Sequence, residues 1–287
     1  MPRYSHHSRT RRRNRGRFGP LFKLLCVAAV MVALTVGATV FFRVEAVTVS
    51  GNQRYTREEI IAASGIELGD NLYSLNKIRI DQNIRATLPY IGDLTINRSL
   101  PSTIVITVTE WEAVAQVAVP DPERVAALQR ELVEQEGEDA PALVTAQEPW
   151  LISVGGKLLE PAAPDSGGIT VTGLTPLAPQ AGSFLQVPEG EAAQLEALTA
   201  LLKALGEEGI QSQVSAIRLE STYLVVRYAG RFDVKMELNA DFRYDVRLMQ
   251  SIRREMEGKD GEGAAGAMDL TRSPAVYSPA QEQQTAP

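Results

Sequence analysis

Cysteine and histidine, which often supply nucleophiles and transition-metal ligands, are confined to the first 26 residues of this 287-residue chain. The histidines are His6 and His7, and the single cysteine is Cys26. Cys–His and Ser–His nucleophilic sites and histidine metal sites are therefore excluded beyond residue 26, because they need an imidazole or a thiol. We interpret the two adjacent histidines as solvated residues, and no disulfide can form within the chain.

Carboxylates are plentiful, with 35 Asp and Glu residues, but their pattern does not predict a catalytic pair. A glycosidase needs two carboxyl groups about 5 to 10 Å apart in a cleft, and no sequence feature predicts such a cleft. The chain also has no Walker loop, dinucleotide fingerprint, GxSxG elbow or paired-cysteine motif. We therefore expect a non-enzymatic protein with no catalytic, cofactor-binding or metal-binding residues.

Charge is distributed very unevenly along the chain. The first 43 residues hold nine Lys or Arg and no acid, which leaves 20 basic against 35 acidic residues in the remainder. Phosphate binding needs clustered positive charge, so we expect no nucleic-acid partner for the acidic part. The arginine-rich N-terminus precedes an apolar run, and this position indicates retention in the cytoplasm beside anionic lipid headgroups.

The apolar run itself predicts a membrane anchor. Residues 24–42 form 19 uncharged positions, and a helix needs about 20 apolar residues to cross about 30 Å of hydrocarbon. A cleaved signal peptide is the alternative, but its apolar region is usually about 7 to 15 residues and ends in small residues. This run ends in Phe41, Phe42 and Arg43, which favours an anchor. The positive-inside rule then places residues 1–23 in the cytoplasm and the remainder outside.

After the anchor, the pattern predicts a small α+β domain at residues 43–117. Its expected elements are strand 44–52, a helix from Thr56 to Gly65, a helix over 75–88, and strands 93–98 and 102–112. Thr56 and Glu59 have the spacing of a capping box, which marks the start of the first helix. The order β-α-α-β-β is compact enough for both helices to cover one face of a three-stranded sheet.

The remaining chain predicts an acidic segment and then a second, β-rich domain with helices. Residues 118–149 are acidic, with a helix expected over 123–136, and we interpret them as a partly disordered insert or linker. Residues 150–280 form the second domain, and 281–287 a disordered tail. The expected elements of the second domain are a hairpin around Gly155–Gly156, strand 169–174, helix 191–205, three strands over residues 215–239, helix 242–256 and an extended segment 267–280.

The first domain resembles a known family. The strand ending in Gly51–Asn52, the helix opening at Thr56, Gly65 before a second helix, and the strand that begins with residues 100–104 resemble a POTRA domain. Its position directly after an anchor is similar to the FtsQ/DivIB family of bacterial cell division proteins. In that family a second β domain follows, which corresponds here to residues 150–280, whereas the acidic segment 118–149 departs from the family pattern.

The resemblance implies a scaffold in the plasma membrane at the division septum. It implies binding to FtsL-type and FtsB/DivIC-type proteins outside the membrane, with septal peptidoglycan synthases as further candidate partners, to help assemble septal cell-wall synthesis. We transfer the partner-binding role to the late extended segment, which is expected to form an exposed sheet edge. The candidate residues are Asp269, Leu270, Ala275, Val276 and Tyr277. Tyr277 is the expected aromatic anchor, and the alternative is that its ring packs on its own sheet.

Two other functions compete with this interpretation. A membrane-anchored protein that binds or hydrolyses the cell wall remains open, although the expected motifs are missing. A POTRA-containing outer-membrane transporter would need a β-barrel of many strands of about 10 residues each. Too few residues follow the first domain to build one.

Overall fold

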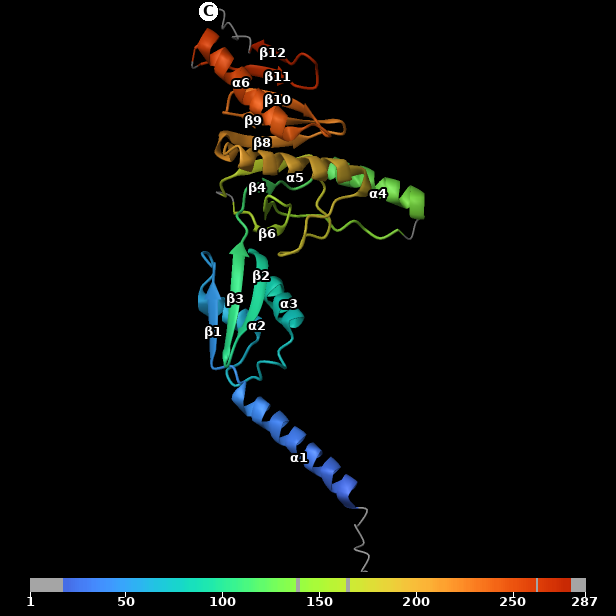
Figure 1. Ribbon diagram of the computed structural model, residues 1–287. Coiled ribbons are helices and arrows are strands. Elements are labelled where there is room, and N and C mark those ends of the chain that lie inside the picture. Colours follow the sequence, from blue (N-terminus) through green and yellow to red (C-terminus); the bar gives the residue numbers. More distant parts are fainter. Residues whose placement is uncertain (1–17, 138–139, 164–165, 262, 280–287) are drawn as a thin grey trace, which may run out of the picture.

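The computed structural model describes residues 18–137, 140–163, 166–261 and 263–279. Helix α1 (Phe18–Phe41) leads into a region around a three-stranded sheet, and a second region around a nine-stranded sheet follows (Figure 1). This is the mixed α+β architecture that the sequence predicts. His6, His7, most of the basic tail and the tail 281–287 lie outside the described residues.

Helix α1 is long and apolar enough to cross a membrane. Its 24 residues span about 36 Å at 1.5 Å per residue, against about 30 Å of hydrocarbon in a bilayer. None of the stretch Gly19–Gly37 is buried within the protein, and the helix projects from the rest of the chain (Figure 1). These features fit a single-pass membrane protein.

The first region is built on strands β1 (Ala46–Ser50), β2 (Ile91–Ser99) and β3 (Thr103–Glu110), in the order β1-β3-β2. Strand β1 runs parallel to β3, and β2 runs antiparallel to it. Helices α2 (Arg57–Ser64) and α3 (Lys77–Thr87) pack against this sheet, with Ile60 and Ile84 fully buried beside Ile106. The predicted β-α-α-β-β order is therefore present.

Side chains at the helix starts define this fold locally. Thr56 and Glu59 form the predicted capping box, with the Thr56 N–H donating to Glu59 Oε2 at 2.8 Å and the Glu59 N–H donating to Thr56 Oγ1 at 3.2 Å. Gly65 ends α2 in the left-handed conformation that favours glycine. Asn76 caps α3, so that helix begins at Lys77 and Leu75 lies before it.

The second region holds one sheet in the order β12-β11-β10-β9-β8-β7-β4-β5-β6. The strands are β4 (Ala115–Val117), β5 (Trp150–Ile152), β6 (Leu158–Pro161), β7 (Ile169–Thr172), β8 (Val214–Leu219), β9 (Tyr223–Tyr228), β10 (Phe232–Glu237), β11 (Gly266–Asp269) and β12 (Val276–Pro279). Short helical turns occupy Glu189–Glu191 and Gln211–Gln213. The β4–β7, β7–β8 and β10–β11 pairs are parallel, and the others are antiparallel.

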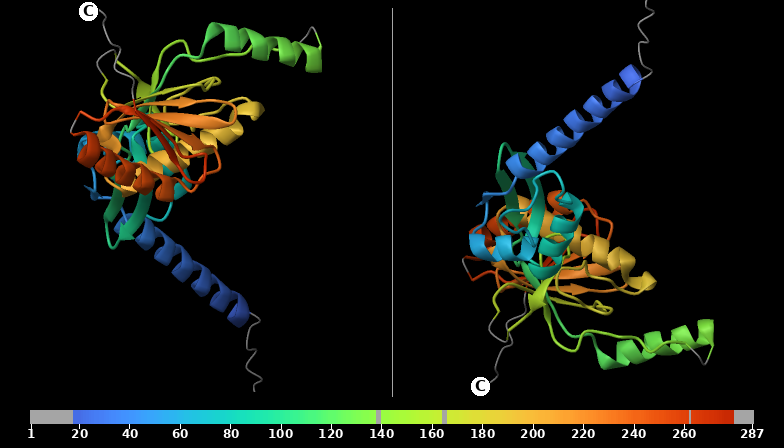
Figure 2. Two further views of the ribbon diagram at one scale, coloured as in Figure 1. Left: turned by 90° about the horizontal axis from the view of Figure 1, so that it is seen from above. Right: turned by 90° about the horizontal axis from the view of Figure 1, so that it is seen from below.

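Helices α5 (Ala192–Glu207) and α6 (Phe242–Asp260) pack on this sheet and on each other (Figure 2). The predicted leucine face of α5 enters the core, where Leu198, Leu201 and Leu205 are fully buried. Val246 and Met249 of α6 are buried in the same core. The helices therefore close one face of the sheet, while the opposite face of β8 to β12 carries polar side chains.

Strand β4 differs from the sequence expectation. Residues 115–117 were expected within the first domain, yet β4 pairs with β5 and β7 of the second sheet. Ala115 and Val117 are buried in the second core, and three residues are too few to give a periodic signal of their own. Helix α4 (Pro122–Glu136), capped by Asp121, follows and extends away from the sheet (Figure 2).

The two regions meet at a compact junction. Tyr90 of the first region is buried against Leu151 and Leu159 of the second, with Trp111 packed beside them. Lys157 Nζ donates to the Ile91 carbonyl oxygen at 2.8 Å. Burial lowers the pKa of Lys157, and the nearby Arg85 charge acts in the same direction.

Candidate partner-binding edge of the second sheet

Strand β12 is the end strand of the second sheet. Among the described residues it pairs only with β11, in an antiparallel register that places Met268 opposite Tyr277 and Asp269 opposite Val276. Strand β11 in turn runs parallel to β10. The segment that the sequence predicts as one extended piece is thus a hairpin, and β12 alone forms the outer edge.

Two of the predicted site residues stabilise the turn between β11 and β12. The Asp269 carboxylate accepts hydrogen bonds from Thr271 Oγ1 at 2.6 Å and from the Thr271 N–H at 3.0 Å. The Thr271 hydroxyl contributes most to lowering the pKa of Asp269. Leu270 is half-buried against the core, and its N–H donates to the Lys235 carbonyl oxygen at 2.9 Å.

The other three predicted residues lie on or beside β12 and differ in exposure. Val276 is 40% exposed, whereas Ala275 is half-buried. The Tyr277 hydroxyl donates to the Ala265 carbonyl oxygen at 2.9 Å, and its ring centroid lies 6.5 Å from that of Phe232. The ring of Tyr277 therefore packs on its own sheet, as the alternative interpretation expects, and Val276 is the most exposed of the five.

A shallow groove of about 340 Å³ runs beside this edge on the open face of the sheet. Its lining includes Lys235, Asp269, Val276 and Ser278. The charges around it are balanced: Arg227 pairs with Asp233 at 2.9 Å, and Lys235 Nζ lies 4.2 Å from the Tyr223 ring centroid. This arrangement suits an extended chain that pairs with β12 through backbone hydrogen bonds.

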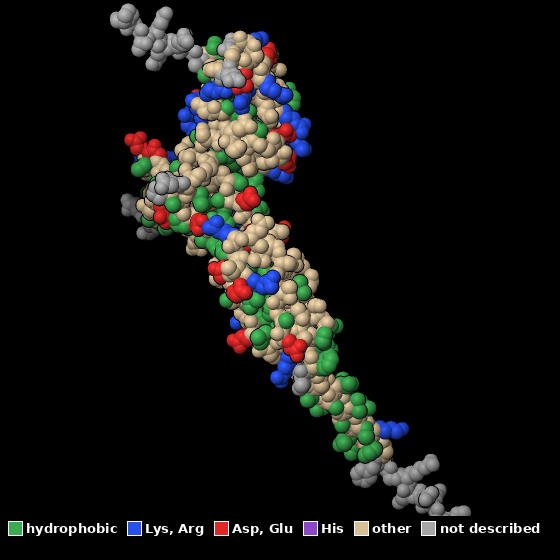
Figure 3. All heavy atoms as spheres, turned by 90° about the vertical axis from the view of Figure 1, so that its left-hand side faces the viewer, with side chains coloured by type: hydrophobic (Ala, Val, Ile, Leu, Met, Phe, Trp, Pro, Cys, Tyr) green, Lys and Arg blue, Asp and Glu red, His purple; other side chains and the backbone are tan. Residues whose placement is uncertain are grey.

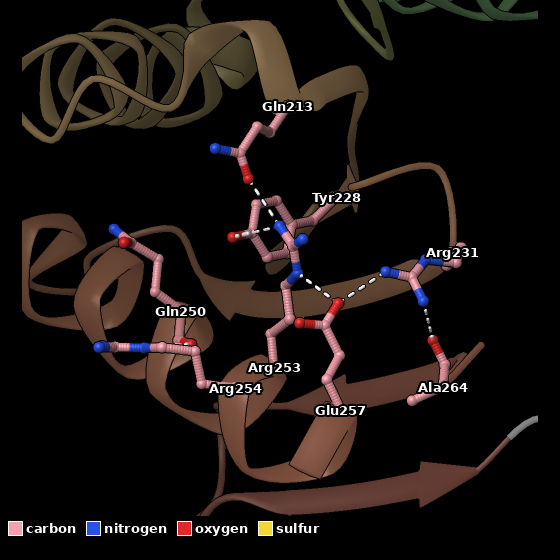
Figure 4. Close-up of polar contacts among 8 residues, drawn as sticks. All are labelled: Gln213, Tyr228, Arg231, Gln250, Arg253, Arg254, Glu257 and Ala264. Atoms are coloured by element: carbon pink, nitrogen blue, oxygen red, sulfur yellow. Dashed lines mark hydrogen bonds and ion pairs between the residues drawn. The ribbon is translucent and has the colours of Figure 1, made fainter. Parts of the chain in front are cut away.

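A polar cluster on α6 supports the start of β11, and the sequence interpretation did not identify it. Glu257 Oε1 accepts hydrogen bonds from Arg253 Nε at 2.8 Å and from an Arg231 terminal nitrogen at 2.6 Å (Figure 4). Arg253 also donates to Gln213 Oε1 at 2.6 Å and to the Tyr228 hydroxyl at 3.2 Å. Arg253, the largest contributor, lowers the pKa of Glu257.

This cluster positions the edge hairpin. Arg231 donates to the Ala264 carbonyl oxygen at 3.0 Å, and the Gly266 N–H donates to the Arg231 carbonyl oxygen at 3.2 Å. A Cβ on Gly266 would lie 2.3 Å from the Ser278 carbonyl oxygen, so only glycine fits where β11 meets β12. In the sequence, only the four-residue spacing of Arg253 and Glu257 could have indicated this cluster, because oppositely charged residues four apart interact on a helix.

The part of the chain that the structure describes contains no group of three or more His, Cys, Asp or Glu residues placed to hold a metal ion. Lys and Arg side chains instead gather over the upper part of the second region (Figure 3). The candidate site is therefore the end strand β12 of the second sheet, with paired charges such as Arg227 and Asp233 beside it.

Comparisons with known proteins match the first region. A family model described as a POTRA domain of the FtsQ type matches residues 42–111. The chain is 33% identical over 103 residues to cell division protein FtsQ of Corynebacterium glutamicum, covering 34% of this chain and 46% of that protein. It is 34% identical over 103 residues to cell division protein DivIB of Geobacillus kaustophilus, covering 34% and 39%. It is also 40% identical over 70 residues to cell division protein DivIB of Clostridium tetani, covering 24% and 26%.

The chain thus spans less than half the length of these curated relatives. The matched range 42–111 holds the three-stranded sheet with α2 and α3, and it follows directly on an apolar helix of membrane-spanning length. Residues 42–111 thus form a POTRA domain of the FtsQ type, and over this part the chain is similar to FtsQ and DivIB cell division proteins.

Proposed function

We propose that this protein is a non-enzymatic scaffold of the bacterial division machinery. It binds FtsL-type and FtsB/DivIC-type proteins outside the membrane and so helps to assemble septal cell-wall synthesis, with septal peptidoglycan synthases as further partners. The observation that carries this proposal is the position of β12, a short strand with Val276 exposed that stands at the end of the nine-stranded sheet. The relatives support this proposal because they are named as cell division proteins.

The proposed topology follows from charge. Eight basic residues up to Lys23 lie on the cytoplasmic side, α1 crosses the plasma membrane, and both sheets lie outside at the septum. We place the change from the first to the second domain at residues 111–115, between the end of β3 and the start of β4. The acidic helix α4 then belongs to the second domain.

Strand addition explains how such an edge selects a partner. Backbone hydrogen bonds to β12 supply affinity, and contacts with alternate side chains supply specificity. Val276 is the exposed apolar contact on this edge, and Pro279 ends the pairing because proline has no N–H to donate. The partner therefore pairs over few residues and needs further contacts, for which the groove beside Lys235 and Ser278 is available.

The proposal is tested with the full chain in detergent and the extracytoplasmic parts of FtsL-type and FtsB/DivIC-type proteins from the same organism. Val276→Asp places a charge on the β12 edge, and Thr48→Asp is the matched control on exposed edge strand β1. We expect V276D to weaken binding about tenfold, since edge contacts of this kind carry about 1.4 kcal/mol or more. T48D is expected to leave binding unchanged.

Two results contradict the proposal. Loss of binding with T48D but not V276D places the contact on the first sheet, and absence of binding by a folded wild-type chain removes the scaffold function. The enzymatic alternative is tested by zymography with the same preparation. A zone of cell-wall clearing would contradict the non-enzymatic assignment.

A further inference from the structure

The end of the first region nearest α1 carries large apolar side chains on its surface. Leu68 is 73% exposed, Ile78 70%, Leu100 60% and Tyr73 56%. We call these four residues the membrane-end surface. In the space-filling view, hydrophobic side chains cover α1 and occur again on the adjoining end of the first region (Figure 3). Exposed apolar groups gathered at one end of a soluble domain indicate a contact surface.

The fold fixes this surface close to the end of α1. The Leu72 N–H donates to the Phe42 carbonyl oxygen, and the Val44 N–H donates to the Asp70 carbonyl oxygen, each at 2.8 Å. Val44 comes three residues after Phe41, the last residue of α1, so their Cα atoms lie within about 11 Å of each other. The loop that carries Leu68 and Tyr73 is thereby tied to the exit of the helix.

Side-chain contacts make this connection more rigid. The Phe42 ring stacks edge-on against the Tyr73 ring at 5.1 Å and against the Phe41 ring at 5.2 Å. Arg98 Nε donates to the Leu72 carbonyl oxygen at 2.6 Å, which fixes the loop to β2. The turn after β2, which carries Leu100, lies at the same end because the Glu45 N–H donates to the Ser102 carbonyl oxygen at 2.8 Å.

We propose that the membrane-end surface lies in the headgroup and upper acyl region of the leaflet from which α1 emerges. This inference rests on the membrane anchorage in the proposed function. A lipid surface is the favoured occupant because the patch continues the exposed apolar surface of α1 at Phe41, which is itself 67% exposed. Leu and Ile gain by leaving water there, and a tyrosine keeps its hydroxyl at the polar level.

The charges around this surface identify the driving force. Exposed Arg43, Lys77 and Arg79 and half-buried Arg98 are largely offset by acids at the same end, which are Glu45, Glu67 and Asp70. Contact through apolar side chains therefore dominates over attraction to anionic lipid. The first region is then held at a fixed tilt against the bilayer, which sets the direction in which the second region extends.

The test uses the full chain reconstituted in lipid vesicles and site-directed nitroxide labels. In a Cys26→Ser background, Leu68→Cys, Ile78→Cys and Leu100→Cys report on the surface, and exposed Gln53→Cys reports on the opposite end of the same sheet. A label on the native Cys26 reports on α1. We expect the three surface labels to show a severalfold higher ratio of oxygen to polar nickel-reagent collisions than Q53C, with little change between low and high salt.

The other outcomes overturn the inference in distinguishable ways. Surface labels that match Q53C while the Cys26 label lies in lipid leave the anchorage intact and remove the lipid contact. Surface labels shielded from both reagents show that a protein, such as a second copy, covers the patch instead. A Cys26 label that is open to the polar reagent removes the anchorage itself.

Discussion

The two regions outside α1 handle buried polar groups in different ways. Among the described residues of the first region, Ser64 is the only polar side chain that is buried. The second region buries three charged side chains, which are Lys157, Glu191 and Asp245. The first region instead uses surface carboxylates to satisfy its backbone, since Glu110 accepts hydrogen bonds from three consecutive N–H groups at 2.6 to 3.1 Å.

This contrast teaches which forces stabilise each region. The first region depends on buried apolar side chains and on helix caps. Its unfolding free energy should therefore respond mainly to substitutions that change the packing of its core. The second depends in addition on buried charges, whose free energy changes with protonation and with loss of a partner. The same substitution or pH change should therefore affect the two regions differently.

The largest expected effect comes from replacing one of two glycines, each of which follows a strand in its own region. Gly51 follows β1 and Gly173 follows β7, and both have positive φ. A Cβ at Gly51 would lie 2.0 Å from the Val108 carbonyl oxygen, and one at Gly173 would lie 2.0 Å from that of Leu219. Gly51→Ala and Gly173→Ala should each lower the unfolding free energy of their own region by about 2 to 4 kcal/mol.

Amide hydrogen exchange resolves these effects by region. G51A should raise exchange in the first region alone, and G173A in the second alone. Gly258→Ala is the control, because a Cβ there meets nothing within 4 Å. If either glycine variant loosens both regions equally, they unfold as one unit and the contrast between them is lost.

Loss of a buried carboxylate should have the next largest effect. Glu191 accepts hydrogen bonds from the Thr175 N–H at 2.6 Å and from Arg124 Nε at 2.9 Å, and Arg124 lies in the first turn of α4. Glu191→Ala should lower the unfolding free energy by about 2 kcal/mol, because the buried Thr175 donor loses its acceptor. Tryptic cleavage within α4 should also become faster, whereas exposed Glu189→Ala should change neither.

Two carboxylates, Asp245 in the second region and Glu59 in the first, should contribute pH dependences of opposite sign. Burial, with Asp241 and Glu237 nearby, raises the pKa of Asp245 from 3.8 to about 6. The stability that neutral Asp245 contributes is thus present below pH 3.8 and lost as the pH rises through about 6. Asp245→Asn should raise the unfolding free energy by about 1 to 2 kcal/mol at pH 8, after allowance for solvent screening, and change little near pH 4.

Glu59 provides the opposite case in the first region. The Thr56 N–H lowers the pKa of Glu59 below 4.5, so its stabilising effect is present above pH 4.5 and lost as the pH falls through the lowered value. Glu59→Gln should therefore destabilise at neutral pH and not in acid. Denaturant unfolding at several pH values checks both variants, and equal slopes for the two would refute the contrast.

Sequence reasoning succeeded where signals are local. The capping box at Thr56 and Glu59, the leucine face of α5 and the hairpin turn at Gly155–Gly156 each depend on residues close in sequence, and all are present. The assignment of 115–117 failed because the pairing of β4 with β7 joins segments about 50 residues apart. Such long-range parallel pairing leaves no short-range pattern.

The candidate edge shows the same limit at the level of single side chains. A short late segment with Pro274 in it predicts a strand at the edge of a sheet, because proline limits the length of pairing. In the structure β12 is the end strand. The inward packing of Tyr277 was only one of two alternatives, because a four-residue strand fixes no face until Phe232 is placed beside it. The contact of Arg253 with Tyr228 and Gln213 joins three elements and was not foreseen.

The smallest expected effect concerns the junction, where the two regions are joined. The Tyr90 hydroxyl donates to Glu160 Oε1 at 2.6 Å, and the Arg54 guanidinium lies 3.8 Å from the centre of the Tyr90 ring. Tyr90→Phe keeps the ring and removes the hydrogen bond, so it should lower the unfolding free energy by about 1 kcal/mol. The exposed Tyr244→Phe on α6 should have no effect.

A double-mutant cycle of Tyr90→Phe with Glu160→Gln measures the coupling across the junction directly. A coupling of about 1 kcal/mol means that the contact persists in solution and that the regions move as one body. A coupling near zero means that other contacts join the regions, namely the packing of Tyr90 on Leu151 and Leu159 and the hydrogen bond from Lys157 to Ile91. In that case the hydrogen bond does not help to fix the orientation of β12 relative to the membrane, which then depends on the apolar packing of Tyr90 and on residues 111–115.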